Sequence, residues 1–147
     1  MAVRVQKEDF DPTTELDALS AGRDNIGAMV SFTGLVRGGD VSEMELEHYP
    51  GMTEKALEEI EAEARERWPL EGVTIIHRVG PLAPGARIVF VATASRHRAA
   101  AFEAAEYLMD FLKTRAPFWK KETTAEGDRW VDARETDDAA TARWNRS

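Results

Sequence analysis

The 147-residue sequence predicts an α+β fold with a mostly antiparallel sheet. Two observations lead to this prediction. Strand-like segments follow one another through short turns, as in hairpins, more often than they alternate with helices. Two long segments also place apolar residues at the 3.6-residue spacing of amphipathic helices. With 43% hydrophobic and 31% charged residues the composition is globular, so we expect residues 1–147 to form a single domain.

The first elements are two strands separated by a short helix. Residues 3–6 alternate between apolar and polar side chains, which favours a strand. Asp11 is a candidate cap for a helix with a proline in its first turn, and this helix ends near residue 21. The β-forming residues 26–37 predict a strand with a bulge or a close backbone approach near Gly34.

The next strand and helix have clear apolar faces. In the strand predicted over residues 41–49, Met44 and Leu46 share one face with a histidine, and glutamates occupy the other. Thr53 is a candidate cap for the following helix, whose apolar stripe ends at Trp68. Because glutamates cover the opposite side, this helix is typical of a solvated surface helix.

A hairpin and the longest helix come next. Residues 73–80 and 87–95 read as strands of a hairpin, connected through the five-residue turn 81–85, which contains two prolines and a glycine. Ser95 is placed to cap a helix over about residues 96–115.

Pro117 ends that helix, because proline cannot continue the hydrogen-bond ladder and pushes the preceding residue toward extended geometry. Two short strands, 118–123 and 129–133, follow around a Glu-Gly-Asp turn and form a small C-terminal β-hairpin. The tail, residues 134–147, is charged and weakly helical.

The overall composition excludes several classes of function. The longest apolar run is far shorter than the ~20 residues that cross a bilayer, and the N-terminus lacks the apolar core of a signal peptide. The net charge of −8 argues against general nucleic-acid binding. There is no cysteine, which excludes disulfides and thiolate chemistry by the chain itself. We therefore expect a cytoplasmic protein that binds neither membrane nor nucleic acid.

Two lysines flank the predicted chain reversal at Pro117. Lys113 lies in the last helical turn and Lys120 in the strand just after the proline, so both ammonium groups can face one pocket. Like charges repel, and a chain tolerates such a pair most readily where anions bind or where a lysine takes part in chemistry. In the other interpretation, Lys113 only complements the helix dipole and Lys120 is a solvated strand residue.

Basic residues also gather at two other structural breaks. Arg37 precedes a Gly-Gly loop, and Arg96, His97 and Arg98 lie at the start of a helix, where cations oppose the dipole. An anion such as phosphate would remove that conflict, although long side chains that reach solvent explain the pattern equally well. The other two histidines, one at position 48 and one at 77, read as ordinary strand residues. The three histidines have no metal-ligand spacing, so we expect no metal and no cofactor.

Six blocks of sequence, in order, resemble the large, catalytic subunit of molybdopterin synthase. They cover about residues 27–130. The blocks are Gly27-Ala28 with Phe32-Thr-Gly-Leu-Val-Arg37; Leu46-Glu-His-Tyr-Pro-Gly-Met52; His77-Arg-Val-Gly-Pro-Leu82; Ser95-Arg-His-Arg98 with Ala101-Phe102; Leu112-Lys-Thr-Arg-Ala-Pro-Phe-Trp-Lys-Lys-Glu122; and Gly127-Asp-Arg-Trp130.

This resemblance implies an α/β-hammerhead fold and a sulfur transfer. In that family the sulfur arrives as a C-terminal glycine thiocarboxylate on a small ubiquitin-like partner subunit. It is transferred to cyclic pyranopterin monophosphate to form the dithiolene of molybdopterin, in molybdenum cofactor biosynthesis. Family members self-associate as the central dimer of a heterotetramer. The lack of cysteine agrees with sulfur brought in by a partner.

The resemblance also assigns roles to residues. It implies that Lys113 and Lys120 are catalytic, and we expect Lys113 to be partly buried. The implied substrate-binding residues are Leu35, Val36, Arg37, His97, Arg98, Lys113, Lys120, Lys121 and Glu122. Phe32 and Met109 are candidates for lining the pterin pocket. The alternative function is a non-catalytic module that binds an anionic small molecule or a ubiquitin-like tail.

Overall fold

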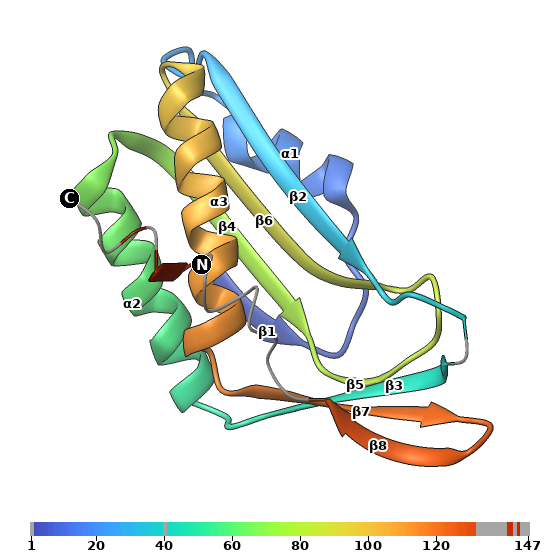
Figure 1. Ribbon diagram of the computed structural model, residues 1–147. Helices are drawn as coiled ribbons and strands as arrows, with labels where there is room; N and C mark the ends of the chain where they lie inside the picture. Colours follow the sequence, from blue (N-terminus) through green and yellow to red (C-terminus); the bar gives the residue numbers. More distant parts are fainter. Residues whose placement is uncertain (1, 40, 132–140, 143, 145–147) are drawn as a thin grey trace.

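Two four-stranded sheets and three helices make up the computed structural model, which describes residues 2–39, 41–131, 141, 142 and 144 (Figure 1). In chain order the elements are β1 (Val3–Gln6), α1 (Pro12–Ser20), β2 (Ala28–Leu35), β3 (Val41–His48), α2 (Met52–Arg67), β4 (Leu70–Arg78), β5 (Gly80–Leu82), β6 (Arg87–Ser95), α3 (Arg98–Arg115), β7 (Phe118–Thr124) and β8 (Gly127–Val131). Most of the predicted tail, residues 134–147, lies outside the described residues.

Sheet A has the strand order β1-β4-β6-β2 and is covered on both faces. β1 runs parallel to β4, and the other pairs are antiparallel. Successive residues of β4 point to opposite sides: Ile75 packs in the core formed with α2 and α3, whereas Ile76 packs with Phe10 and Phe90. Leu16 and Leu19 of α1 pack against this second cluster. Helix α1 therefore covers one face of sheet A, and α2 and α3 cover the other (Figure 1).

Sheet B has the order β5-β3-β7-β8 and is antiparallel throughout. Met44 and Leu46 of β3 are buried in the same core as the residues of sheet A that face α2 and α3. Sheet B lies across the end of sheet A where α3 finishes, and β7 leads directly out of that helix (Figure 1). The predicted α+β class, the mostly antiparallel sheets and the C-terminal hairpin are confirmed.

The strand β2 has the feature predicted near Gly34. Its pairing with β6 shifts register between Gly34 and Leu35. A Cβ atom on Gly34 would lie only 2.6 Å from the Cγ1 atom of Val89, so no larger residue fits without movement of its neighbour. The prediction of a bulge or a close approach near Gly34 is therefore confirmed.

The predicted five-residue hairpin connection is wrong. β4 and β6 do form an antiparallel pair, but the chain between them contains β5, which leaves sheet A and pairs with β3 in sheet B. Gly80 begins β5 with a φ of 87°, in the left-handed region that glycine enters without strain. A local turn signal does not reveal that part of a connection pairs with a distant strand.

The predicted cap of the long helix is also wrong. Ser95 ends β6, is buried, and donates its hydroxyl to the Pro69 carbonyl at 2.8 Å. His97 is instead the N-cap of α3, with extended backbone and no capping hydrogen bond from its side chain.

Helix α2 likewise begins before the predicted cap. Gly51 is the N-cap, and Thr53 is buried within the first turn. The Thr53 hydroxyl still accepts a hydrogen bond from the Tyr49 backbone N–H at 3.2 Å, so this side chain ties the helix to the end of β3. By contrast, the predicted Asp11 cap of α1 is confirmed, because its carboxylate accepts from the Thr13 N–H at 3.1 Å.

Candidate functional site

The chain reverses sharply between α3 and β7, as Pro117 predicts. Helix α3 ends at Arg115, and Ala116 already has an extended ψ of 132°. Lys113 therefore lies in the last helical turn, and Lys120 lies in β7. The expected partial burial of Lys113 is wrong, because its side chain is exposed, whereas Lys120 is half-buried.

A buried histidine lies next to both lysines. His77, near the end of β4, is only 5% exposed, and its ring stacks on Phe118 with centroids 3.8 Å apart. Its pKa is lowered from 6.5 to about 3, chiefly by burial, and the charges of Lys113, Lys120 and His48 act in the same direction. The hydrogen bond to the Arg78 carbonyl has the opposite effect on the pKa and is outweighed. Both lysines are thus close enough to one imidazole for their charges to act on it.

Sequence reasoning missed this histidine. The alternation of β4 indicates only that position 77 is a strand residue, and an isolated histidine on a strand carries no spacing signal. The position of His77 directly before Arg78-Val79-Gly80, in one of the blocks that carry the family resemblance, is the signal that points to it. His48, also read as an ordinary strand residue, lies beside Phe118 in the register of β3 and β7.

Sheet B directs the residues of β7 to opposite sides. Lys120 pairs with Leu46 in β3 and with Val131 in β8. Lys121 points to the other side, where its Nζ lies 3.7 Å from the Glu45 carboxylate and 5.9 Å from the centroid of the Trp130 ring. The structure therefore separates Lys121 from the side on which Lys120 lies.

Glu122 shares the side of Lys120 but is held by the hairpin. Its Oε1 accepts a hydrogen bond from the Nε of Arg129 at 3.1 Å, directly across β7 and β8. The Glu122 side chain is 19% exposed, so this ion pair is partly shielded from water. The pair fixes the carboxylate two residues from Lys120.

The predicted anion-binding residues lie at the other end of α3. His97 and Arg98 are exposed at its N-terminus, and its first turn has no acidic residue. Between Arg98 and Lys113 the helix rises by roughly 22 Å, at ~1.5 Å per residue. One chain therefore does not bring His97 and Arg98 to the two lysines.

Arg37 is remote from His97 and Arg98 as well. Ala28, at the start of β2, pairs with Ser95, whereas Leu35 pairs with Arg87 at the far end of β6. At ~3.3 Å per residue the strand alone spans roughly 23 Å. Within one chain, β2 therefore carries Arg37 away from the start of α3.

The residues beside Arg37 differ in exposure. Leu35 is 56% exposed, whereas Val36 is buried at 2%. The backbone of Val36 is also engaged, since its N–H donates to Ala86 and its carbonyl accepts from Gly85. The structure thus places Val36 in the core.

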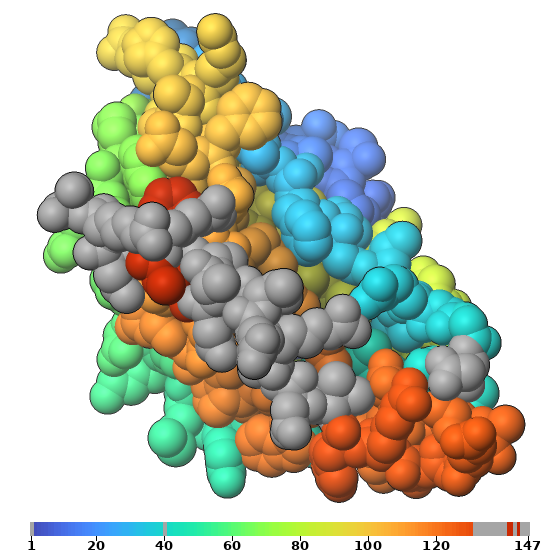
Figure 2. Space-filling view, viewed as in Figure 1, coloured from blue at the N-terminus to red at the C-terminus, as the bar shows by residue number. Residues whose placement is uncertain are grey.

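The two candidate pocket-lining residues lie on neighbouring elements. Phe32 is 44% exposed on β2, and Met109, on α3, is partly buried against the main core. β2 forms one edge of sheet A, and it lies beside α3 on the face seen in Figure 2. Three further apolar side chains are exposed on the same two elements: Met29 and Leu35 on β2, and Phe102 on α3. Apolar side chains therefore gather along this edge of the sheet.

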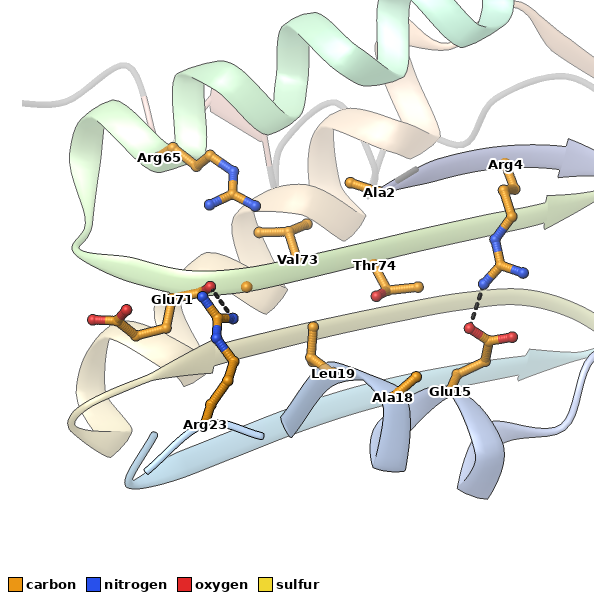
Figure 3. A pocket seen from close by; sticks show the side chains of 11 residues that line it. Ala2, Arg4, Glu15, Ala18, Leu19, Arg23, Arg65, Glu71, Val73 and Thr74 are labelled. Atoms are coloured by element: carbon orange, nitrogen blue, oxygen red, sulfur yellow. Dashed lines mark hydrogen bonds and ion pairs between the residues drawn. The ribbon is translucent and has the colours of Figure 1, made fainter. Parts of the chain in front are cut away.

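A hollow between α1, α2, β1 and β4 contains none of the predicted site residues (Figure 3). Its basic side chains are already engaged: Arg4 pairs with Glu15, and Arg23 donates to the Glu71 carbonyl. Across the described residues, no three His, Cys, Asp or Glu side chains gather as a metal site. In the same part of the chain, no helix is both long and apolar enough to span a membrane.

Comparison with known proteins identifies relatives over nearly the whole chain. The profile of the MoaE protein family matches residues 5–115. The molybdopterin synthase catalytic subunit of Pseudomonas aeruginosa is 60% identical over 148 aligned positions, which cover 98% of this chain and 99% of that protein.

Solved structures agree with this result. The molybdopterin biosynthesis MoaE protein of Burkholderia ambifaria is 59% identical, with a TM-score of 0.87 and full coverage of both chains. The molybdopterin synthase of Staphylococcus aureus is 34% identical, with a TM-score of 0.80, and the match covers 87% of this chain and 95% of that one.

Proposed function

Because this chain belongs to the MoaE family of molybdopterin synthase catalytic subunits, we propose that Lys113 and Lys120 carry out its sulfur transfer. The sulfur donor is the C-terminal glycine thiocarboxylate of a small ubiquitin-like partner, and the acceptor is cyclic pyranopterin monophosphate. The product is the dithiolene of molybdopterin. The observation that carries the proposal is that both lysines, from different elements, lie close enough to His77 to act on its charge.

The chemistry suits a cationic site. The thiocarboxylate is an anion, and ammonium groups hold it by charge-assisted hydrogen bonds. As its sulfur bonds to a pterin carbon, a C–O bond of that carbon breaks and the oxygen leaves in protonated form. The glycine is then joined to the pterin by a thioester, and water hydrolyses this thioester to release the partner's C-terminal carboxylate and leave the sulfur on the pterin. The lysines neutralise charge as it moves between these groups and exchange protons with them. Glu122, held by Arg129, lies on the same side of β7 as Lys120 and completes this side of the site, whereas Lys121 flanks Lys120 in the sequence but points to the other side.

The substrate phosphate requires the other end of α3. We propose that His97, Arg98 and Arg37 bind it, since the helix N-terminus favours an anion. Roughly 22 Å of helix separates Arg98 from Lys113 within one chain. A complete site therefore requires two copies, with the phosphate-binding residues of one copy facing the lysines of the other. The central dimer of the family brings two copies together, and the exposed apolar edge at β2, with Leu35, Phe32 and Met109 near it, is a suitable surface for that contact.

We also propose a cytoplasmic location. The chain has no cysteine, so it gains nothing from an oxidising compartment. Its substrate and its partner are both soluble molecules.

A reconstituted reaction tests the proposal. Thiocarboxylated small subunit, cyclic pyranopterin monophosphate and this chain are mixed, and dithiolene formation is followed. Lys120→Ala should abolish turnover while the complex with the small subunit still forms. Lys55→Ala, which removes an exposed lysine from α2, is the matched control and should be fully active. If Lys120→Ala prevents complex formation, Lys120 is an assembly residue and its catalytic role is wrong.

A further inference from the structure

One buried side chain connects the two sheets beside the lysine pair. His77 belongs to sheet A, where it pairs with Val5 and Val89. Phe118, on which its ring stacks with an interplanar angle of 17°, is the first residue of β7 in sheet B. The contact therefore lies at the point where the chain leaves α3 and enters the strand that carries Lys120.

The orientation of the imidazole is fixed. Its Nδ1 lies 2.8 Å from the Arg78 carbonyl oxygen. A carbonyl oxygen only accepts, so Nδ1 carries the proton and the ring is the neutral Nδ1–H tautomer. Burial removes the water that would otherwise stabilise a charged form.

The groups that act on this ring come from each neighbouring element. Lys113 is on α3, Lys120 on β7 and His48 on β3, and all three disfavour a positive charge on His77. Arg78, next in β4, directs its guanidinium away, to the carbonyls of Lys7 and Arg87. A neutral aromatic ring at this position adds no further cation to the region of the two lysines.

We propose that His77 is a positioning residue for the sulfur-transfer site: stacked on Phe118 and anchored to the Arg78 carbonyl, it fixes the start of β7 and thereby the direction of Lys120 relative to Lys113. Phe118 and Lys120 are two residues apart on a strand, so their side chains point to the same side. A shift of Phe118 is therefore passed on to Lys120. Displacements of ~1 Å in a reacting group can lower a rate by ~100-fold.

This inference rests on the proposed function, and the test uses the same reconstituted reaction. His77→Phe keeps a neutral ring that can stack on Phe118, whereas His77→Asn keeps a polar group and loses the ring. We expect His77→Phe to retain kcat within about threefold and His77→Asn to lose ~100-fold in kcat with little change in KM. The pH profile of kcat for His77→Phe should keep the wild-type shape, because a positioning ring exchanges no proton during turnover.

A double-mutant cycle separates positioning from a general loss of stability. Phe118→Leu removes the stack from the other side, so the effects of His77→Asn and Phe118→Leu on kcat should be strongly non-additive. Ile76→Val is the control: it lowers stability from the neighbouring buried position, which faces α1, and should leave kcat unchanged.

Four results would overturn the inference: full kcat in His77→Asn, equal losses in the Phe and Asn variants, additive losses in the cycle, or a changed pH profile in His77→Phe. Lys113→Ala run in parallel distinguishes the two proposals. If Lys113→Ala is inactive and His77→Asn is normal, the lysine site stands and only this inference fails. If Lys113→Ala is fully active, the proposed function of the lysines fails instead.

Discussion

The two ends of α3 both carry positive side chains, but only one end favours them. Lys113 and Arg115 occupy the last turn, where the helix dipole attracts cations, and Arg115 also forms a 2.7 Å ion pair with Glu63 of α2. At the other end Arg98 is the first helical residue, and no acidic residue lies in the first turn. The side chain of the N-cap residue His97 makes no capping hydrogen bond.

This difference separates two kinds of binding residue. The cations at the C-terminal end are stabilised by the fold itself, so they keep their positions without a ligand. The cations at the N-terminal end oppose the dipole, and an anion would turn that arrangement into a favourable one. We therefore expect substitutions at the C-terminal end to affect chemistry and those at the N-terminal end to affect ligand binding.

The largest effect is expected from Lys113. Lys113→Ala should lower the rate of sulfur transfer by ~100- to 1,000-fold, as removal of one group that stabilises a transition state does. Binding of the small subunit and of the pterin should persist. Lys113→Arg should lose transfer as well, because a guanidinium keeps its proton and differs in shape. Single-turnover assays and pulldown of the small subunit measure both properties; normal transfer by Lys113→Arg would show that Lys113 contributes only its positive charge.

The next largest effect is expected from acid, which should lower the stability of the protein through His77, beside the C-terminal end of α3. The unfolded chain protonates His77 near pH 6.5, but the folded protein does so only near pH 3. Neutral His77 therefore contributes fully to the free energy of unfolding above about pH 6.5. That contribution is lost as the pH falls toward 3, by on the order of 1.4 kcal/mol per pH unit. Urea unfolding between pH 7 and 4 measures it. His77→Phe should have a shallower dependence by that amount, and identical slopes in the two proteins would contradict the prediction.

Arg98→Ala should reveal the role of the N-terminal end. Loss of charge-assisted hydrogen bonds to a phosphate costs about 1.5–3 kcal/mol, so affinity for the pterin should fall by roughly tenfold or more. Affinity for the small subunit should not change. Arg115→Ala is the matched substitution at the other end: calorimetric titration should find pterin binding intact, and stability should fall by ~0.2–1 kcal/mol with the lost ion pair. Equal pterin affinity in wild type and Arg98→Ala would refute the assignment.

The smallest effect is expected from a negative charge placed in the first turn of α3, where it complements the helix dipole. Ala99 is exposed in the first turn of α3, and Ala99→Glu would place a negative charge there. The free energy of unfolding should rise by ~0.3–1 kcal/mol at low salt, while pterin binding weakens because the carboxylate competes with the phosphate. Ala99→Gln, without the charge, should do neither. A more stable protein that binds the pterin as tightly as wild type would show that no anion binds at this end.

Much of the fold follows from local sequence signals. The end of α3 at Pro117, the bulge at Gly34 and the Asp11 cap each depend on the conformational limits of one or two residues, which act wherever those residues occur. The placement of β5 in a second sheet does not follow, because it depends on pairing with β3 far away in the chain.

The features of the candidate site also fall into those that follow from local sequence and those that depend on strand pairing. That Lys113 and Lys120 lie near one another follows from a helix, a proline and a strand in direct succession. The neighbourhood of His77 and the distance between Arg37 and Arg98 do not follow, because each depends on how strands pair within sheet A. Similarly, the alternation of β7 predicts that Lys120 and Lys121 point to opposite sides, but only the packed structure gives Lys121 its partners Glu45 and Trp130.

The pairing of β3 with β7 has a consequence for synthesis. All four strands of sheet A have been synthesised once β6 is complete, so sheet A can form while the ribosome is still making the rest of the chain. Sheet B must wait for β7, and until then the edge of β3 opposite β5 is unpaired. The strand that carries Lys120 is therefore among the last to be made, and a chain truncated after Arg115 would have its helices and sheet A but an aggregation-prone open strand where the active site should form.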